Sequence, residues 1–376
     1  MNTLQWLEKL IAFDTVSSNS NMHLIKAIEN WFKLHNIKSK IIPGRINSKA
    51  NLFATIPAWN GSTEGGILLT GHTDVVPVAG QIWKTDPFVA TEIDGKIYGR
   101  GACDMKGFVA VLLSLVPDFQ KLKLIKPIHF SFTCDEEIGC IGVDYLVDYF
   151  QKKDIHPEGC IVGEPSNMRP IVGEKGRRLY HCQVQGKAVH SSLASEGCNA
   201  IVYASRLISY IHTLAKYVEK NGPFDHDFDF PFTTITTNVI SGGTATNVIP
   251  GACEFILEIR YTKQFPLENF RSQIENYINN DLLLEMRETY SEVAIYFDET
   301  SDSPGFNAME DSSITRIVRL VTGIKESLKV SYTTEAETFQ AAQIPTVICG
   351  PGSIEQAHTA NEFITIEQLN RERERE

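Results

Sequence analysis

The chain has 376 residues, of which 43% are hydrophobic and 22% charged, a balance typical of a globular protein with more than one domain. Its formal net charge of −11 disfavours nucleic acid or an anionic membrane surface as a partner. The eight cysteines form no Cys-x-x-Cys pair and several lie in apolar runs, which predicts buried thiols rather than a disulfide framework. Residues 1–13 do not resemble a signal peptide, and no apolar run approaches the roughly 20 residues that span a bilayer, so we expect a cytoplasmic protein.

The first 177 residues alternate predicted helices and strands. We expect helices over residues 3–13, 22–34, 107–119 and 141–150, and strands over residues 38–42, 51–56, 67–74, 128–134 and 159–162. Polar groups follow several of these strands. This pattern is typical of an α/β sheet that carries its functional groups at the strand ends.

A different pattern begins at residue 178. Strands over 178–184, 233–240, 252–261 and 293–297, with helices over 198–220 and 267–286, give a β-α-β-β-α-β order. We therefore expect a separate α+β domain over residues 178–298, inserted into an α/β domain made of residues 1–177 and 299–376. The α/β pattern resumes with helices at 312–322 and 336–342 and a strand at 346–349. The Arg-Glu repeat at 371–376 indicates a solvated helix end or a tag remnant rather than a binding element.

The strand at 67–74 ends in a His-x-Asp pair. Because side chains alternate along a strand, His72 and Asp74 emerge on the same side. A neutral imidazole is a good zinc ligand, and a carboxylate two residues on can orient it or a neighbouring group. On its own this pair is weak, since surface turns contain it as well.

Two acidic clusters strengthen the metal interpretation. Asp104 precedes a predicted helix and could be a helix cap, but the glycines around it indicate a tightly folded loop that delivers one carboxylate. Asp135, Glu136 and Glu137 follow an apolar strand, where three adjacent acids are costly unless a cation compensates them. Adjacent carboxylates could divide their roles, one binding a metal and another moving protons.

Two further groups complete the set. Glu164 follows the strand at 159–162, and His358 lies in a glycine-containing loop after the strand at 346–349. A lone loop histidine is usually without a role. Two histidines and three carboxylates together nevertheless form a mixed nitrogen and oxygen set that suits a pair of zinc ions.

These motifs, in this order over nearly the whole chain, resemble the M20 metallopeptidase family. Within it, the stretches 74–78, 83–88, 334–336 and 350–353 are most similar to acetylornithine deacetylases. The resemblance implies a zinc-peptidase-like α/β/α catalytic domain, an inserted lid and dimerisation domain, and a homodimer acting on a small N-acyl amino acid.

The resemblance also implies the roles of individual residues. His72 and Glu164 would hold one zinc ion, Glu137 and His358 a second, and Asp104 would bridge them; cobalt or manganese are possible substitutes. A cis peptide is implied after Asp104. Asp74 would orient His72, and Glu136 would be the general base and acid.

The inserted domain supplies other candidates by the same resemblance. His190, otherwise an ordinary turn histidine, would reach the partner subunit's active site and stabilise an oxyanion. Asn247 and Arg260 would bind the substrate, Arg260 through its α-carboxylate, although Arg260 could equally be a surface strand residue. Lys175 and Glu335 are further substrate-binding candidates. Glu174 is a departure, because acetylornithine deacetylases usually have histidine there; this acid favours either a cationic ornithine side chain or a different substrate.

The expected reaction is removal of the acetyl group from N2-acetyl-L-ornithine, which gives L-ornithine and acetate in arginine biosynthesis. Succinyl-diaminopimelate desuccinylase, a broader N-acyl-amino-acid deacylase and a dipeptidase remain alternatives, because all share this metal site. A catalytically silent metal-binding dimer is disfavoured, since such a protein would be expected to have lost Glu136 or a metal ligand.

Overall fold

The computed structural model describes residues 1–308, 310–326 and 328–371, so positions 372–376 of the Arg-Glu repeat lie outside the described residues. The chain forms two compact units. Unit 1 contains Met1–Gly173, Phe306–Leu328 and the chain from Thr334 onward, and unit 2 contains Glu174–Gly305 and Lys329–Thr333. No helix among the described residues is long and apolar enough to cross a membrane.

Unit 1 is built on a mixed sheet whose four central neighbours, β6, β3, β7 and β17, run parallel. The strand order is β1 (Ser39–Pro43), β2 (Ala50–Ile56), β6 (Ile128–Thr133), β3 (Ile67–His72), β7 (Gly159–Val162), β17 (Thr346–Ile348), β8 (Ile171–Glu174) and β15 (Phe306–Asn307), and β16 (Leu328–Val330) pairs with β8. A small sheet contains β18 (Phe363–Thr365), β5 (Lys96–Tyr98) and β4 (Thr91–Ile93).

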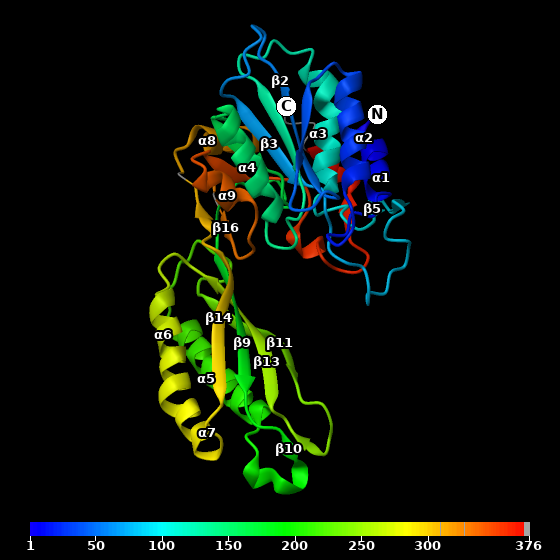
Figure 1. The fold of residues 1–376 in the computed structure, drawn as a ribbon. Helices are drawn as coiled ribbons and strands as arrows, with labels where there is room; N and C mark the ends of the chain where they lie inside the picture. The colour runs from blue at the N-terminus through cyan, green and yellow to red at the C-terminus, as the bar shows by residue number, and fades with distance from the viewer. Residues whose placement is uncertain (309, 327, 372–376) are drawn as a thin grey trace. The chain divides into compact units, whose positions relative to one another are not determined.

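Helices cover both faces of the central sheet, which confirms the predicted α/β/α class. Figure 1 shows α1 (Thr3–Ile11), α2 (Met22–Leu34) and α3 (Lys106–Phe119) on one face, and α4 (Ile141–Lys153), α8 (Ser313–Thr322) and α9 (Ala336–Ala341) on the other. Helix α10 (Ile366–Arg371) follows β18. Every residue of α3 from Lys106 to Val116 is buried, because this helix is apolar on nearly all sides and lies in the core.

Unit 2 is a four-stranded antiparallel sheet with helices, in the predicted β-α-β-β-α-β order. The strand order in space is β11 (Thr234–Gly242), β13 (Ala252–Tyr261), β9 (Gly176–Gln185) and β14 (Ala294–Ser303). Alternate residues of β9 and β13 join the helices in one core, among them Cys182, Phe255 and Leu257. Helix α5 (Ala200–Asn221) is one long helix. The predicted second helix is interrupted: α6 (Leu267–Tyr277) passes through a π-helical turn (Ile278–Leu282) into α7 (Leu283–Thr289).

A short ribbon completes unit 2: β10 (Val189–His190) pairs with β12 (Val248–Ile249), and a 3-10 turn (Ser191–Glu196) follows β10. All eight cysteines lie among the described residues as thiols, and all except Cys140 are buried. The prediction of buried thiols therefore holds for seven of them.

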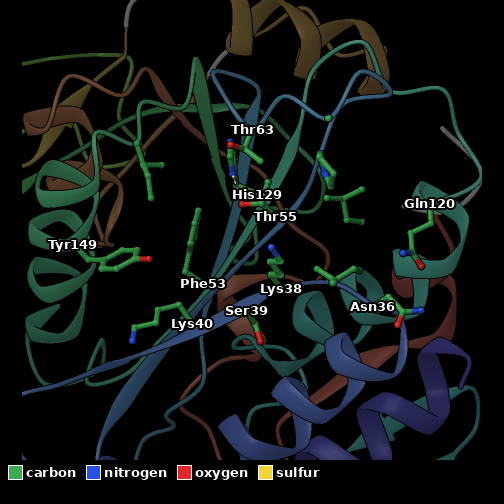
Figure 2. Close-up of a pocket in the computed structure, with 15 residues that line it drawn as sticks. Asn36, Lys38, Ser39, Lys40, Phe53, Thr55, Thr63, Gln120, His129 and Tyr149 are labelled. Atoms are coloured by element: carbon green, nitrogen blue, oxygen red, sulfur yellow. Dashed lines mark hydrogen bonds between the residues drawn. The ribbon is translucent and has the colours of Figure 1, made fainter.

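Unit 1 has a hollow of about 690 Å³, lined by both polar and apolar side chains, where β2 and β6 meet (Figure 2). Lys38 and Lys40 line it together with Thr55 and His129. His129 Nε2 donates to the Gly65 carbonyl at 2.8 Å, so Nδ1 accepts from the Thr55 hydroxyl at 2.9 Å. Burial lowers the pKa of His129 and favours this neutral form. The hollow is at the start of β6, whereas the acids Asp135, Glu136 and Glu137 follow the end of this strand. The hollow is therefore separate from the predicted metal site.

Candidate metal centre

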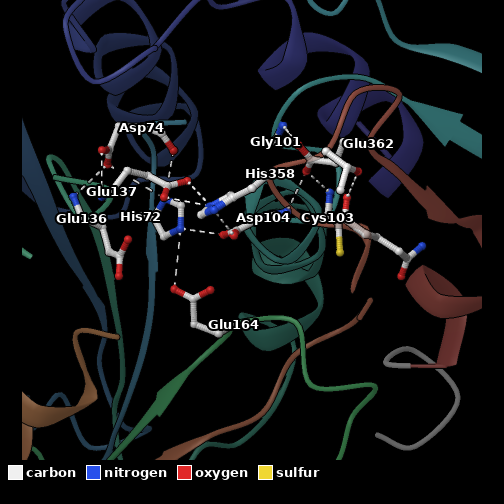
Figure 3. Close-up of polar contacts among 12 residues, drawn as sticks. His72, Asp74, Gly101, Cys103, Asp104, Glu136, Glu137, Glu164, His358 and Glu362 are labelled. Carbon is white, nitrogen blue, oxygen red and sulfur yellow. Dashed lines mark hydrogen bonds and ion pairs between the residues drawn. The ribbon is translucent and has the colours of Figure 1, made fainter. Parts of the chain in front are cut away.

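The ends of three neighbouring parallel strands bring His72, Glu136 and Glu164 together. His72 ends β3 and is in register with Thr133, the last residue of β6. Glu136 comes three residues after the end of β6, and Glu164 comes two residues after the end of β7, which pairs with the other side of β3. Because carboxyl ends of parallel strands meet at one edge of a sheet, this topology converts sequence-distant residues into one cluster (Figure 3).

His72 directs one ring nitrogen toward two carboxylates. Its Nδ1 lies 2.9 Å from the main-chain carbonyl of Asp74, and since a carbonyl only accepts, Nδ1 carries the hydrogen. In the neutral ring, Nε2 then faces Asp104 Oδ1 at 2.9 Å and Glu164 Oε1 at 3.6 Å. Burial opposes protonation, but the charges of Glu164 and Asp104 outweigh it and raise the pKa of His72 well above its ordinary value. A proton or a metal cation satisfies this arrangement.

Asp104 lies between the two predicted histidine ligands. Its Oδ1 contacts His72, and its Oδ2 is 3.3 Å from His358 Nε2. His358 Nε2 is also 3.0 Å from Glu137 Oε2. Burial alone would raise the pKa of Asp104, but hydrogen bonds from His358 and His72 hold it well below its usual range. One oxygen toward each histidine is the geometry expected of a bridging carboxylate.

The donor atoms fit a divalent cation. His72, Glu136 and Glu164 form one triad, and His72, Asp104 and Glu137 a second, in which the ligand atoms lie within 4.8 Å of one another. Burial raises the pKa of Glu136 and Glu164 well above the ordinary value, and the repulsion of neighbouring acids adds to this effect. The charge of His72 opposes the rise but does not cancel it. Since no lysine or arginine is paired with these carboxylates among the described contacts, a metal ion is the charge that would compensate them.

Asp74 contacts His72 through its main chain, not through the carboxylate that was predicted to orient the ring. Its main chain accepts from His72, while its side-chain Oδ1 remains 3.9 Å from Nδ1 of that ring. The side chain instead accepts the main-chain N–H groups of Glu136 at 3.1 Å and Glu137 at 3.3 Å, together with the Ser17 hydroxyl at 2.7 Å. Asp74 therefore fixes the acidic loop as well as the histidine.

Other members of the loops have structural roles. Asp135 turns away from the acidic cluster and pairs with buried Lys49 at 2.8 Å, a partner that has no local sequence signal. The peptide after Asp104 is cis, as the resemblance implied. Gly101 has a φ of +81°, and a Cβ there would lie 2.7 Å from Val75 Cγ1, so the turn before Asp104 requires glycine.

The three candidates from the inserted region belong to unit 2, which also contains Lys175, a residue expected in the catalytic domain. His190 and Asn247 are exposed, and Lys175 is buried with Nζ donating to the Phe232 carbonyl at 2.7 Å. Arg260 pairs with Glu258 at 3.0 Å and donates to the Ser331 carbonyl at 3.1 Å. Their roles toward a substrate therefore stay predictions.

Glu335 belongs to unit 1 and is only 1% exposed, beside Thr133. Burial raises the pKa of Glu335 to about 7. A carboxyl with a raised folded-state pKa contributes stability that is fully present below the ordinary glutamate pKa and lost as the pH rises through about 7. Glu335→Gln should remove this loss. The difference in free energy of unfolding, variant minus parent, should therefore increase by about 3 kcal/mol as the pH rises from 4.5 to 8. Urea unfolding of chelated protein at several pH values would test this.

The exposed Glu326 provides the matched control, because Glu326→Gln should leave the pH profile of stability unchanged. Parallel profiles for the parent and Glu335→Gln would show that Glu335 is ionised at no cost and contradict the expectation.

Buried His72 and the acids beside it, together with the half-exposed His358, form the donor set of a metal-dependent hydrolase. The model of peptidase family M20/M25/M40 matches residues 68–374, and the chain belongs to that family. It is a metal-dependent amidohydrolase of this group, and the sequence-based family assignment is confirmed.

Curated relatives agree with this assignment, and solved structures share the fold. Acetylornithine deacetylase from Pasteurella multocida is 35% identical over 99% of this chain and 95% of its own length, and that from Pectobacterium carotovorum is 34% identical over 96% and 91%. A Staphylococcus aureus tripeptidase has the same fold, with a TM-score of 0.77 at 20% identity over 98% of this chain and 94% of its own. Aminopeptidase PepT from Bacillus cereus gives a TM-score of 0.76 at 19% identity, over 100% and 96%.

Proposed function

We propose that this protein hydrolyses N2-acetyl-L-ornithine to L-ornithine and acetate in arginine biosynthesis, as a cytoplasmic homodimer. The observation that carries the proposal is similarity to acetylornithine deacetylases over nearly the whole length of the chain. The geometry supports amide hydrolysis, because a protonatable buried carboxyl, Glu136, lies beside the candidate metal ligands. We expect neither nucleic acid nor a membrane as a partner.

Two zinc ions per subunit would be held by the residues around Asp104, with cobalt or manganese as substitutes. His72 and Glu164 would bind one ion, Glu137 and His358 the other, and Asp104 both. Bound there, zinc supplies Lewis acidity that makes water a better nucleophile and the acetyl carbonyl a better electrophile.

Glu136 would move the protons of the reaction. Its carboxylate takes a proton from the attacking water as the new C–O bond forms to the acetyl carbon. It then gives that proton to the amide nitrogen as the C–N bond breaks, so that the free amine leaves and acetic acid forms, which releases its own proton to give acetate. Its raised pKa suits this task, because a carboxyl that binds a proton more readily than an ordinary glutamate can both accept and return one.

A substrate panel tests the assignment. Zinc-loaded protein should hydrolyse N2-acetyl-ornithine with a kcat/KM at least about tenfold above N-acetyl-methionine, N-succinyl-diaminopimelate and a dipeptide, a preference of about 1.4 kcal/mol. Equal rates on several acyl amino acids would favour the broader deacylase, and preference for the succinylated substrate would favour the desuccinylase. No hydrolysis of any of the four by metal-loaded protein would favour a binding protein.

His190 would act across the dimer as an oxyanion donor. Its Nδ1 accepts from the Ser192 main-chain N–H at 3.3 Å, so in the neutral ring Nε2 carries the hydrogen and can donate. His190→Ala should lower kcat by roughly 10²–10³-fold with zinc content unchanged. Mixing inactive His190→Ala and Glu136→Ala subunits should restore about a quarter of the parent rate, because half of the dimers then contain one complete site.

A mixture that stays inactive while the subunits exchange would place His190 in its own subunit's site or in none. An unchanged kcat for His190→Ala would remove the residue from the reaction altogether.

A further inference from the structure

A single buried carboxylate, that of Glu362, organises the loop that carries Asp104 (Figure 3). Glu362 Oε1 accepts the main-chain N–H groups of Cys103 at 2.9 Å and Asp104 at 3.0 Å. Glu362 Oε2 accepts the N–H of Gly101 at 3.0 Å and Arg100 Nη1 at 2.8 Å. Glu362 is 1% exposed, so four donors converge on one carboxylate that water does not reach.

The same network reaches the loop that carries His358. Arg100, which is also fully buried, donates to the Thr359 carbonyl at 3.3 Å and to Gln81 Oε1. Gln81 Nε2 in turn donates to the main-chain carbonyl of His358 at 3.1 Å. Two loops separated by more than two hundred residues are thereby joined by one ion pair and its hydrogen bonds.

This connection matters because the two loops are not strands of the central sheet. His72 ends β3 and Glu164 closely follows β7, so the sheet itself positions that pair. Asp104 and His358 lie on irregular segments, and their 3.3 Å contact depends on what holds those segments together. Glutamine at position 362 could not replace the carboxylate, because its NH2 group would face N–H donors instead of accepting from them.

We propose that Arg100, Glu362 and Gln81 form a positioning clamp that sets the separation of Asp104 and His358. Through that separation the clamp determines the affinity of the metal site that Glu137 and His358 would form with Asp104. The His72 and Glu164 position depends on it less. The inference rests on the proposed two-metal centre and goes beyond the substrate assignment.

Zinc titration against a competing chelator tests the clamp without any substrate. In Glu362→Gln the ion that His358→Ala removes should lose roughly 10–100-fold in affinity, the range expected when a partner behind a ligand is removed. The ion that His358→Ala retains should change by less than about threefold. Glu355→Gln, an exposed glutamate on the same loop, is the matched control and should bind both ions as the parent does.

A second background separates positioning from general destabilisation. In His358→Ala one ion should remain, and adding Glu362→Gln should change its affinity by less than about threefold. Equal weakening of both ions in Glu362→Gln, or further weakening in the His358→Ala background, would reduce Glu362 to a stabilising residue and overturn the clamp. Unchanged zinc affinities would overturn it as well.

Gln81→Ala covers the case in which Glu362→Gln does not fold, because Gln81 is partly exposed and supplies only the outer link of the clamp. It should weaken the same ion by a smaller factor. If Gln81→Ala leaves both affinities unchanged, the link to His358 has no role. Since the readout is metal affinity, a wrong substrate assignment would leave these results intact.

Discussion

Replacing Glu136 by alanine should lower kcat by roughly 10²–10⁴-fold while the protein keeps its metal ions. The side chain is buried beside His72 and Glu164, and its pKa is raised by that burial and by neighbouring acids, which suits a group that takes and returns a proton. Alanine removes the proton carrier and leaves His72, Asp104 and Glu164 in place. Steady-state kinetics on acetylornithine and metal content by atomic absorption, measured on one preparation, give both quantities.

The geometry makes metal content the decisive half of this experiment. Glu136 is close enough to His72 and Glu164 to be a ligand, so distance alone does not separate the two roles. A variant that loses metal in proportion to activity would make Glu136 a ligand and overturn its assignment as proton carrier. Glu137→Ala is the matched contrast, because it should lose metal as well as activity.

Much of the site could be predicted because it depends on strand ends. An apolar run followed by a polar group is visible in the sequence, and β6, β3 and β7 are adjacent, so His72, Glu136 and Glu164 meet as the pattern indicated. The α/β class and the β-α-β-β-α-β order of unit 2 were predictable for the same reason, since burial periodicity is local. The π turn at Ile278–Leu282 was not, because the helical pattern continues through it.

The parts that could not be predicted depend on partners far away in sequence. Glu362 is a single acid in a loop, and its importance comes from N–H groups about 260 residues earlier, which have no side-chain signature. The pairing of Asp135 with Lys49 is of the same kind. Such contacts follow from loop packing, which periodicity does not encode. An acid four residues after a candidate metal histidine is the one available signal, and by itself it is weak.

Replacing Asp104 by asparagine should have the largest effect on metal binding. Each oxygen of Asp104 faces a different histidine, Oδ1 toward His72 and Oδ2 toward His358. Asparagine keeps one oxygen and puts an NH2 group, which cannot bind a metal, in the place of the other. The affinity for at least one ion should therefore fall by more than the roughly 10–100-fold that loss of a supporting partner costs, and turnover should fall with it.

Calorimetric zinc titration of chelated Asp104→Asn should show at most one tightly bound ion where the parent shows two. Asp148→Asn is the matched control. Asp148 is an exposed helix residue whose Oδ2 lies 3.9 Å from Lys152 Nζ, so this variant should change neither the number of bound zinc ions nor their affinities. If Asp104→Asn bound two ions with the parent's affinities, Asp104 would not bridge them. The short contacts of Asp104 to both histidines would then stabilise the metal-free fold alone.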